Sequence, residues 1–159
     1  MTESATGRPL DVGSRRSAGM RGSPNGSPPI IIGMAHHPNG ARGIVAVLIV
    51  ADDAEHAAIL RRYQAVLEVE PSTIGPKTVL IRAGTRIEIV PASAAVQVLP
   101  GEKAPAPSYL AAVTVHVDDL DRARTLVGES GTETTTTDTG FFVSGRDACG
   151  AGLFFTAVR

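Results

Sequence analysis

Several features that would mark common protein classes are scarce or missing in this chain of 159 residues. It has no tryptophan, a single cysteine and an aromatic content of 4%. One cysteine excludes an internal disulfide framework, and no apolar run reaches the roughly 20 residues of a membrane-spanning helix. The 15 basic and 16 acidic residues nearly cancel, and few aromatic rings are available to stack on bases. We therefore expect neither a membrane nor a nucleic-acid partner.

The first 29 residues are expected to form a disordered tail. They are rich in Gly, Ser, Pro and Arg and contain almost no large apolar side chains, so they bury too little surface to offset conformational entropy. The pair Arg15–Arg16 suggests twin-arginine export, but no apolar stretch of sufficient length follows it. A cytoplasmic location is therefore expected.

From Gly43 onward, strand and helix patterns alternate. The first group is a strand at 44–50, a helix from Asp52–Asp53 to about Leu67, and two strands joined by an Ala83-Gly84 turn, at 77–82 and 85–90. Residues 91–108 carry four prolines and are expected to be a linker, with a short extended piece at 96–99.

The same order of patterns returns after the linker. A strand at 110–117 precedes a helix that opens at Asp118–Asp119, and strands are expected at 132–139, 141–144 and 153–158. Val50-x-Asp52 recurs as Val117-x-Asp119, 67 residues later. The chain therefore contains an internal repeat of strand, helix and about three strands.

This repeat resembles the vicinal-oxygen-chelate superfamily, which includes glyoxalases, extradiol dioxygenases and antibiotic-binding resistance proteins. The resemblance rests on the two Val-x-Asp motifs, on Tyr63 and Leu67 in the first helix, and on Ala123 in the second. His37-Pro38-Asn39-Gly40-Ala41 also resembles a segment of glyoxalase-like members, although a structural turn is the favoured interpretation of it.

The resemblance covers residues 30–159 and implies an α+β fold. Two tandem βαβββ modules would form an incomplete mixed β-barrel around a central cavity. Module one would span residues 43–90 and module two residues 109–159, with the linker 91–108 between them.

Metal-dependent members of this superfamily carry a His or Gln early on each first strand and a Glu on each last strand. The matching positions here are Val45 and Ala112 on the first strands, and Glu88 and Phe154 on the last. One carboxylate cannot hold a divalent ion that prefers about six ligands. We therefore expect no metal and no other cofactor.

Side chains alternate along a strand, so parity assigns each one to a face. With Val45 and Ala112 marking the cavity face, as the resemblance implies, parity also places Val47 and Ile49 in the cavity and packs Ile87 and Ile89 against a helix. The cavity is expected to be mainly apolar and to take a small apolar or aromatic molecule. The candidate catalytic residues are Glu88 and His116, and the candidate ligand-binding residues are Arg86, Thr114 and Phe154.

Each candidate also has a purely structural interpretation. Glu88 can form an ion pair with Arg86, two residues away on the same face. His116 can be a partly solvated residue at a strand end, and Phe154 can simply fill space. Cys149, in a Gly-rich loop, is expected to be an unreactive thiol.

Three functions remain open at this level. The first is a metal-independent, glyoxalase-like module that binds a small molecule. The second is a metal-free lyase or isomerase that uses Glu88 as general base, assisted by His116 or Arg86. The third is a subunit that pairs with a second copy, as a homodimer, through exposed strand edges.

Overall fold

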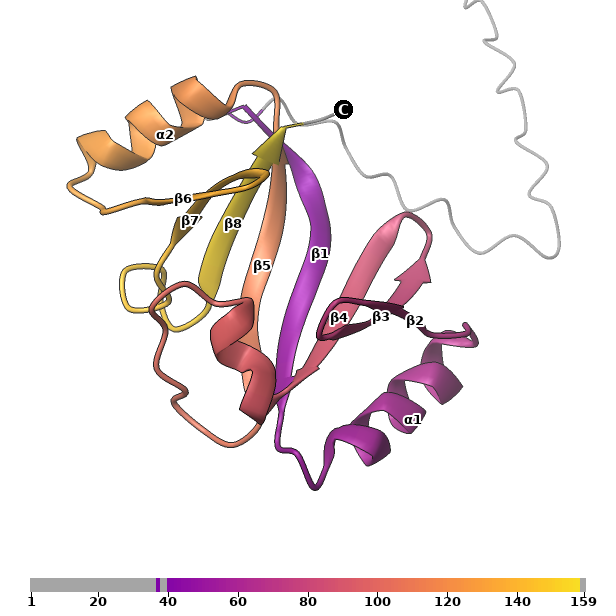
Figure 1. Ribbon diagram of the computed structural model, residues 1–159. Coiled ribbons are helices and arrows are strands. Elements are labelled where there is room, and N and C mark those ends of the chain that lie inside the picture. Colours follow the sequence, from indigo (N-terminus) through magenta and orange to yellow (C-terminus); the bar gives the residue numbers. More distant parts are fainter. Residues whose placement is uncertain (1–36, 38–39, 158–159) are drawn as a thin grey trace, which may run out of the picture. The chain divides into compact units, whose positions relative to one another are not determined.

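Eight strands form a single mixed sheet in the computed structural model, which describes residue 37 and residues 40–157 (Figure 1). The expected disordered tail, 1–29, lies outside the described residues, as do Pro38 and Asn39. The strands are β1 (Ala41–Ala51), β2 (Ser72–Ile74), β3 (Lys77–Arg82), β4 (Thr85–Pro91), β5 (Tyr109–Val117), β6 (Thr135–Thr137), β7 (Gly140–Val143) and β8 (Gly152–Ala157).

The strand order across the sheet is β2-β3-β4-β1-β5-β8-β7-β6. The pairs β1–β4 and β5–β8 are parallel, and all other neighbouring strands are antiparallel. Because β2 and β6 do not pair with each other, the sheet is open. With its few helices, it is an α+β fold.

Two helices cover one face of the sheet. Helix α1 (His56–Leu67) packs Ile59, Leu60 and Tyr63 against buried Leu80 and Ile89. Helix α2 (Leu120–Glu129) packs against a second cluster on the same face, formed by Val117, Ala123, Phe141, Val143 and Phe155. Among the residues that the structure describes, no helix has the length and apolar character to cross a membrane.

The opposite face of the sheet carries a short 3-10 helix, η1 (Ala92–Gln97), which lies in front of β1 and β5 in Figure 1. Its alanines pack against Leu48, Val50 and Phe142. The sequence predicted an extended piece at 96–99 here, which is wrong. Because Ala94 and Ala95 are small, the backbone can lie close to the sheet as a helical turn.

The two main helices begin differently. Asp119 caps α2 as predicted, because its side chain accepts a hydrogen bond from the Arg122 N–H at 2.9 Å. Helix α1 begins only at His56, without a side-chain cap. The predicted cap residue Asp53 instead accepts from the Ser93 N–H at 3.1 Å, and Glu55 accepts from the Ser108 hydroxyl at 3.2 Å. These carboxylates therefore fasten residues of the 91–108 connection.

The remaining differences concern short elements. The sequence did not indicate β2, and the strand predicted at 132–139 contracts to β6. The β3–β4 hairpin has the predicted bounds almost to the residue, and its turn residues Ala83 and Gly84 have φ values of 50° and 84°. That geometry matches the right-handed twist of two antiparallel strands.

Candidate functional site

A cavity of about 710 Å³ lies on the η1 side of the sheet, away from α1 and α2. All five candidate site residues from the sequence line it, and they come from β4, β5 and β8. The complete lining is Leu48, Lys77, Arg86, Glu88, Gln97, Val98, Thr114, His116, Thr137, Asp138, Thr139, Phe154, Thr156 and Ala157. The structure thus brings the candidates together, while their roles stay predictions.

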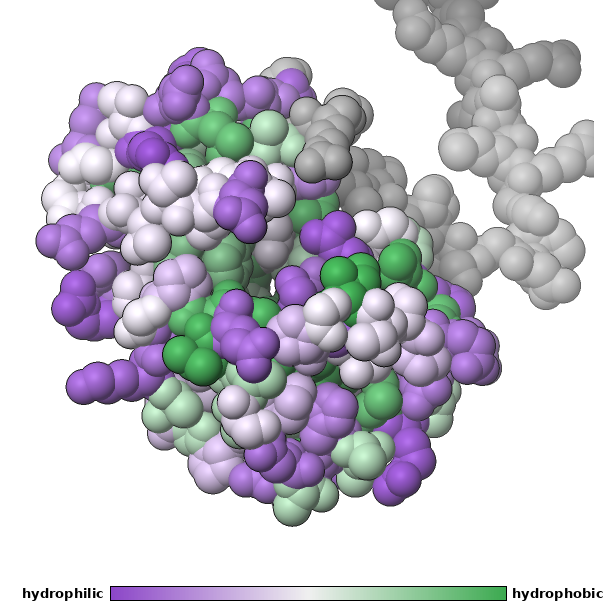
Figure 2. Space-filling view, in the orientation of Figure 1, coloured by the Kyte–Doolittle hydropathy of each residue, from purple (hydrophilic) through white to green (hydrophobic). Residues whose placement is uncertain are grey.

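The cavity lining is more polar than the sequence predicted. Most of its side chains are charged or carry a hydroxyl, amide or imidazole group, and this face of the molecule mixes hydrophilic and hydrophobic residues (Figure 2). The polar groups that were missed come from other elements: Lys77 from β3, Gln97 from η1, and Thr137 to Thr139 from the β6–β7 turn. Strand parity alone does not show which neighbouring turns close over a sheet.

The face predicted for β1 is wrong. Leu48 lines the cavity and pairs in register with Glu88, whereas Ile49 packs on the α1 side. Val45 and Val47 are absent from the lining. The pairing of β1 with β5 has three register shifts, and a displacement of one residue moves every side chain to the opposite face.

A cluster of three charged side chains occupies the β3–β4 end of the cavity. The Arg86 Nε atom lies 3.1 Å from Glu88 Oε1, so the ion pair considered from the sequence is present. Lys77 Nζ adds a second contact, 2.6 Å from Glu88 Oε2. Lys77 was missed, although the hairpin pattern contained the signal: Val79 pairs with Glu88, which places Lys77 diagonally across from it.

A row of residues in register runs across the sheet from this cluster. Arg86 pairs with Ala46, Ala46 with Thr114, and Thr114 with Phe154. The Phe154 ring lies 4.5 Å from the ring of Phe142, which is buried beside it. The cavity therefore has a cationic end at β4 and an aromatic end at β8, three strand spacings or about 14 Å apart along the sheet.

His116 is half-buried and pairs in register with Thr156. The two residues follow Thr114 and Phe154 by two positions along their strands, so they lie on the same face of the sheet. Both side chains line the cavity. They add an imidazole and a hydroxyl group near the β6–β7 turn, and each can donate or accept a hydrogen bond.

The residues present do not fit the metal ion of metal-dependent superfamily members. On the cavity side of β1 and β5, Ala46, Leu48 and Ala112 have no donor atom, and the polar side chains that line the cavity from these two strands are Thr114 and His116. Both oxygens of Glu88 already face cationic groups. Within the described ranges, no group of three or more His, Cys, Asp or Glu side chains is arranged to hold a metal.

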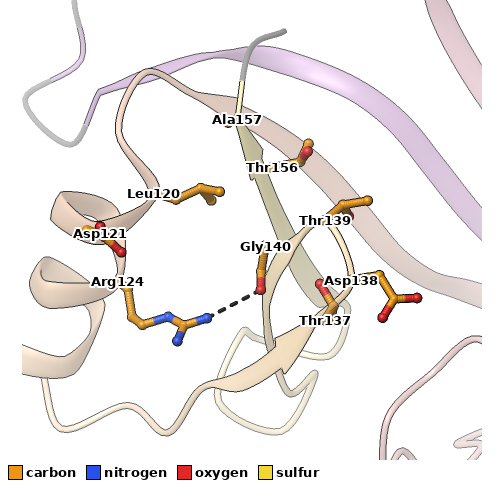
Figure 3. Close-up of a pocket in the computed structure, with 9 residues that line it drawn as sticks. All are labelled: Leu120, Asp121, Arg124, Thr137, Asp138, Thr139, Gly140, Thr156 and Ala157. Atoms are coloured by element: carbon orange, nitrogen blue, oxygen red, sulfur yellow. Dashed lines mark hydrogen bonds between the residues drawn. The ribbon is translucent and has the colours of Figure 1, made fainter.

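A second hollow, of about 410 Å³, lies between α2 and the β6–β7 turn (Figure 3). Arg124 donates a hydrogen bond to the Gly140 carbonyl at 3.3 Å and lies over the Phe141 ring, 5.1 Å from its centroid. These contacts tie α2 to the hairpin, so Arg124 serves the packing of this region. None of the five candidate residues lines this hollow.

A third hollow, of about 490 Å³, lies near Tyr109 and Glu102. Burial, and secondarily the nearby Glu102 carboxylate, raises the pKa of Tyr109 above its ordinary value. Cys149 is exposed and precedes Gly150, which lines this hollow. The Arg146 Nε atom lies 3.1 Å from Asp147 Oδ1, so the guanidinium of Arg146 forms an ion pair with this carboxylate.

His37 and Gly40 are the described residues that directly precede β1. The Gly40 N–H donates to the His37 carbonyl at 2.8 Å, and Gly40 has a φ of 76°. The Gly40 carbonyl in turn accepts from the Asp118 N–H at 3.1 Å. The structural turn expected at Pro38 and Asn39 lies outside the described residues, and neither His37 nor Gly40 lines the 710 Å³ cavity.

No family model and no curated protein matches the sequence. Similar solved structures exist. Methylmalonyl-CoA epimerase from Mycobacterium tuberculosis is 12% identical, with 77% of this chain and 92% of that chain covered and a TM-score of 0.54. A hypothetical protein from Bacillus halodurans C-125 is 14% identical, with 74% and 94% covered and a TM-score of 0.51. The chain therefore has the fold of the vicinal-oxygen-chelate superfamily.

Proposed function

We propose that this chain is a metal-independent module that binds a small molecule in the 710 Å³ cavity. The observation that carries the proposal is that Arg86, Glu88, Thr114, His116 and Phe154 all line this one cavity. Its volume lies within the range of about 300–1,000 Å³ that is typical of small-molecule sites. The unsuitability of the residues for a metal supports a binding mode that depends on side chains alone.

The domain organisation belongs to the same proposal. Outward from the centre of the sheet, one half has the order β1-β4-β3-β2 and the other β5-β8-β7-β6. Each half has one parallel pair next to the centre and one helix between its first two strands. This symmetry supports two tandem modules, residues 43–90 and 109–159, joined by the connection 91–108.

The ligand is proposed to have an apolar or aromatic part. Leu48 and Phe154 form an apolar surface in the cavity, and an aromatic ring can stack on Phe154 in an offset arrangement. The polar groups around this surface then orient the molecule, as a few placed polar groups do in most small-molecule sites.

A metal-free lyase or isomerase is the second candidate. The observation in its favour is that Glu88 and His116, a carboxylate and an imidazole, line the same cavity. Against it, both oxygens of Glu88 contact cations, so a lone pair for proton abstraction competes with two ion pairs. Binding without turnover is therefore the favoured function.

A thermal-shift screen of aromatic and amphiphilic metabolites, with metal removed by chelation, tests the proposal. A ligand that binds only the folded state raises Tm in a saturable way. Phe154→Leu should remove most of that shift in Tm, while the leucine side chain largely keeps the apolar contact with Phe142. The matched control is Val96→Ala, at an exposed position of η1 outside the cavity lining. No saturable shift by any compound would contradict the proposal.

The same ligand separates binding from catalysis. Glu88→Gln keeps the shape of the side chain but removes its charge. Loss of turnover with binding retained would establish the enzyme. A ligand that both the unsubstituted protein and Glu88→Gln bind without converting it chemically would support the binding module.

We further propose a homodimer formed through the β2 or β6 edge, which light scattering at several protein concentrations tests.

A further inference from the structure

Building on the proposed binding function, we infer that the ligand is an organic carboxylic acid. Its carboxylate would be bound by Arg86, and its apolar or aromatic body would lie against Phe154.

The charged cluster has one more positive than negative group. Glu88 is the only carboxylate in direct contact with Lys77 and Arg86 among the described ion pairs. Asp138, the other acidic residue of the lining, lies in the β6–β7 turn and is exposed. A buried carboxylate shared by two cations leaves about one positive charge, which one anionic group on a ligand would balance.

Arg86 has the geometry to supply that contact. A guanidinium carries five N–H donors in a planar fork, and only Nε takes part in the hydrogen bond to Glu88. The structure gives the two terminal amino groups of Arg86 no hydrogen bond to any described residue, and its side chain is 41% exposed while it lines the cavity. A planar carboxylate accepts two parallel hydrogen bonds from such a fork.

The lining favours a carboxylate over a phosphate. Phosphate groups typically bind where backbone N–H groups converge at a helix N-terminus or in a Gly-rich loop. The lining contains no glycine, and η1 contributes Gln97 from its C-terminal end. One excess positive charge also balances a carboxylate better than a doubly charged phosphate.

The row Arg86, Ala46, Thr114 and Phe154 gives the ligand a direction. An acid bound at Arg86 would extend past the Thr114 hydroxyl group toward the Phe154 ring. Because the backbone separation of the two ends is about 14 Å and both end side chains reach into it, an aromatic ring on a short alkyl chain is the size that fits.

Titration calorimetry with 4-phenylbutyrate and its neutral amide, 4-phenylbutyramide, tests the inference. The acid should bind at least tenfold more tightly than the amide. Arg86→Met should reduce this preference to less than threefold and leave binding of the amide unchanged. Arg61→Met, on the exposed side of α1, is the control and should preserve the preference.

Arg86→Lys keeps the charge without the fork and should give an intermediate preference, which also covers the case in which Arg86→Met does not fold. Equal affinity of acid and amide, a preference that survives in Arg86→Met, or tighter binding of phenyl phosphate would each overturn the inference while leaving a binding cavity. If neither compound binds but another compound of the metabolite screen gives a saturable shift in Tm, only the inference of a carboxylic acid would be overturned. Failure of every compound would overturn the binding function as well.

Discussion

Replacing Glu88 by Gln should destabilise the protein by about 2 kcal/mol, because it leaves two cations facing each other without a counter-charge. Breaking a fully buried ion pair by removing one partner costs about 3–5 kcal/mol, whereas an exposed pair contributes about 0–1 kcal/mol. The side chain of Glu88 is 11% exposed, but those of Lys77 and Arg86 are 28% and 41% exposed. Solvent therefore screens the cations, and the cost should fall between the two limits.

Urea unfolding followed by circular dichroism measures this cost. With a slope of about 1.5 kcal/mol per molar urea, a loss of 2 kcal/mol lowers the midpoint by roughly 1.3 M. Glu70→Gln, at an exposed position after α1, is the matched control and should shift the midpoint by less than about 0.3 M. If the urea midpoint of Glu88→Gln shifts no more than that of the control, the ion pairs of Glu88 with Lys77 and Arg86 do not stabilise the fold by the expected amount.

Three further substitutions address the packing and the charge of this fold. Gly140→Ala should destabilise strongly, by about 3 kcal/mol or more in urea unfolding, because the added Cβ would lie 1.9 Å from the Phe155 carbonyl oxygen. Its control, Gly43→Ala, has open space at the added Cβ and should cost less than about 1 kcal/mol. Equal losses of stability in the two variants would contradict the β7–β8 packing. Phe141→Ala should cost about 3–5 kcal/mol, since this ring is fully buried and stacks on Phe155 at 4.5 Å; a loss below about 1 kcal/mol would show that the stack is absent. The raised pKa of Tyr109 means that the folded protein keeps this proton at a pH where the unfolded chain loses it, so its contribution to stability is complete below about pH 10 and is lost above it. Urea midpoints should therefore fall less between pH 9 and pH 10.5 in Tyr109→Phe than in the unsubstituted protein, and parallel declines would count against the burial of this hydroxyl group.

Local patterns of the sequence predicted the elements whose causes are local. The β3–β4 hairpin follows from alternating residues around Ala83-Gly84, and its register follows from the turn. The start of α2 follows from the Asp119 cap. Arg86 and Glu88 are two residues apart on one strand and therefore share a face, so their ion pair was foreseeable from residues close together in the chain.

The remaining features depend on contacts between distant segments. The face of β1 is set by irregular pairing with β5, about 65 residues later, and a β-bulge has no reliable signature in one sequence. The polar lining depends on the β6–β7 turn and on η1, whose positions over the sheet are fixed by tertiary packing. The start of α1 was misplaced because Asp53 and Glu55 contact Ser93 and Ser108 rather than the first turn of the helix.

A crystal structure with the tightest-binding compound of the metabolite screen, collected with anomalous data at the edges of common transition metals, determines whether the 710 Å³ cavity binds a small molecule without a metal. We expect electron density for the compound against Leu48 and Phe154, in contact with Arg86, and no anomalous peak near Glu88. A compound bound outside this cavity, or a metal ion held by Glu88 between the protein and the compound, would contradict this expectation.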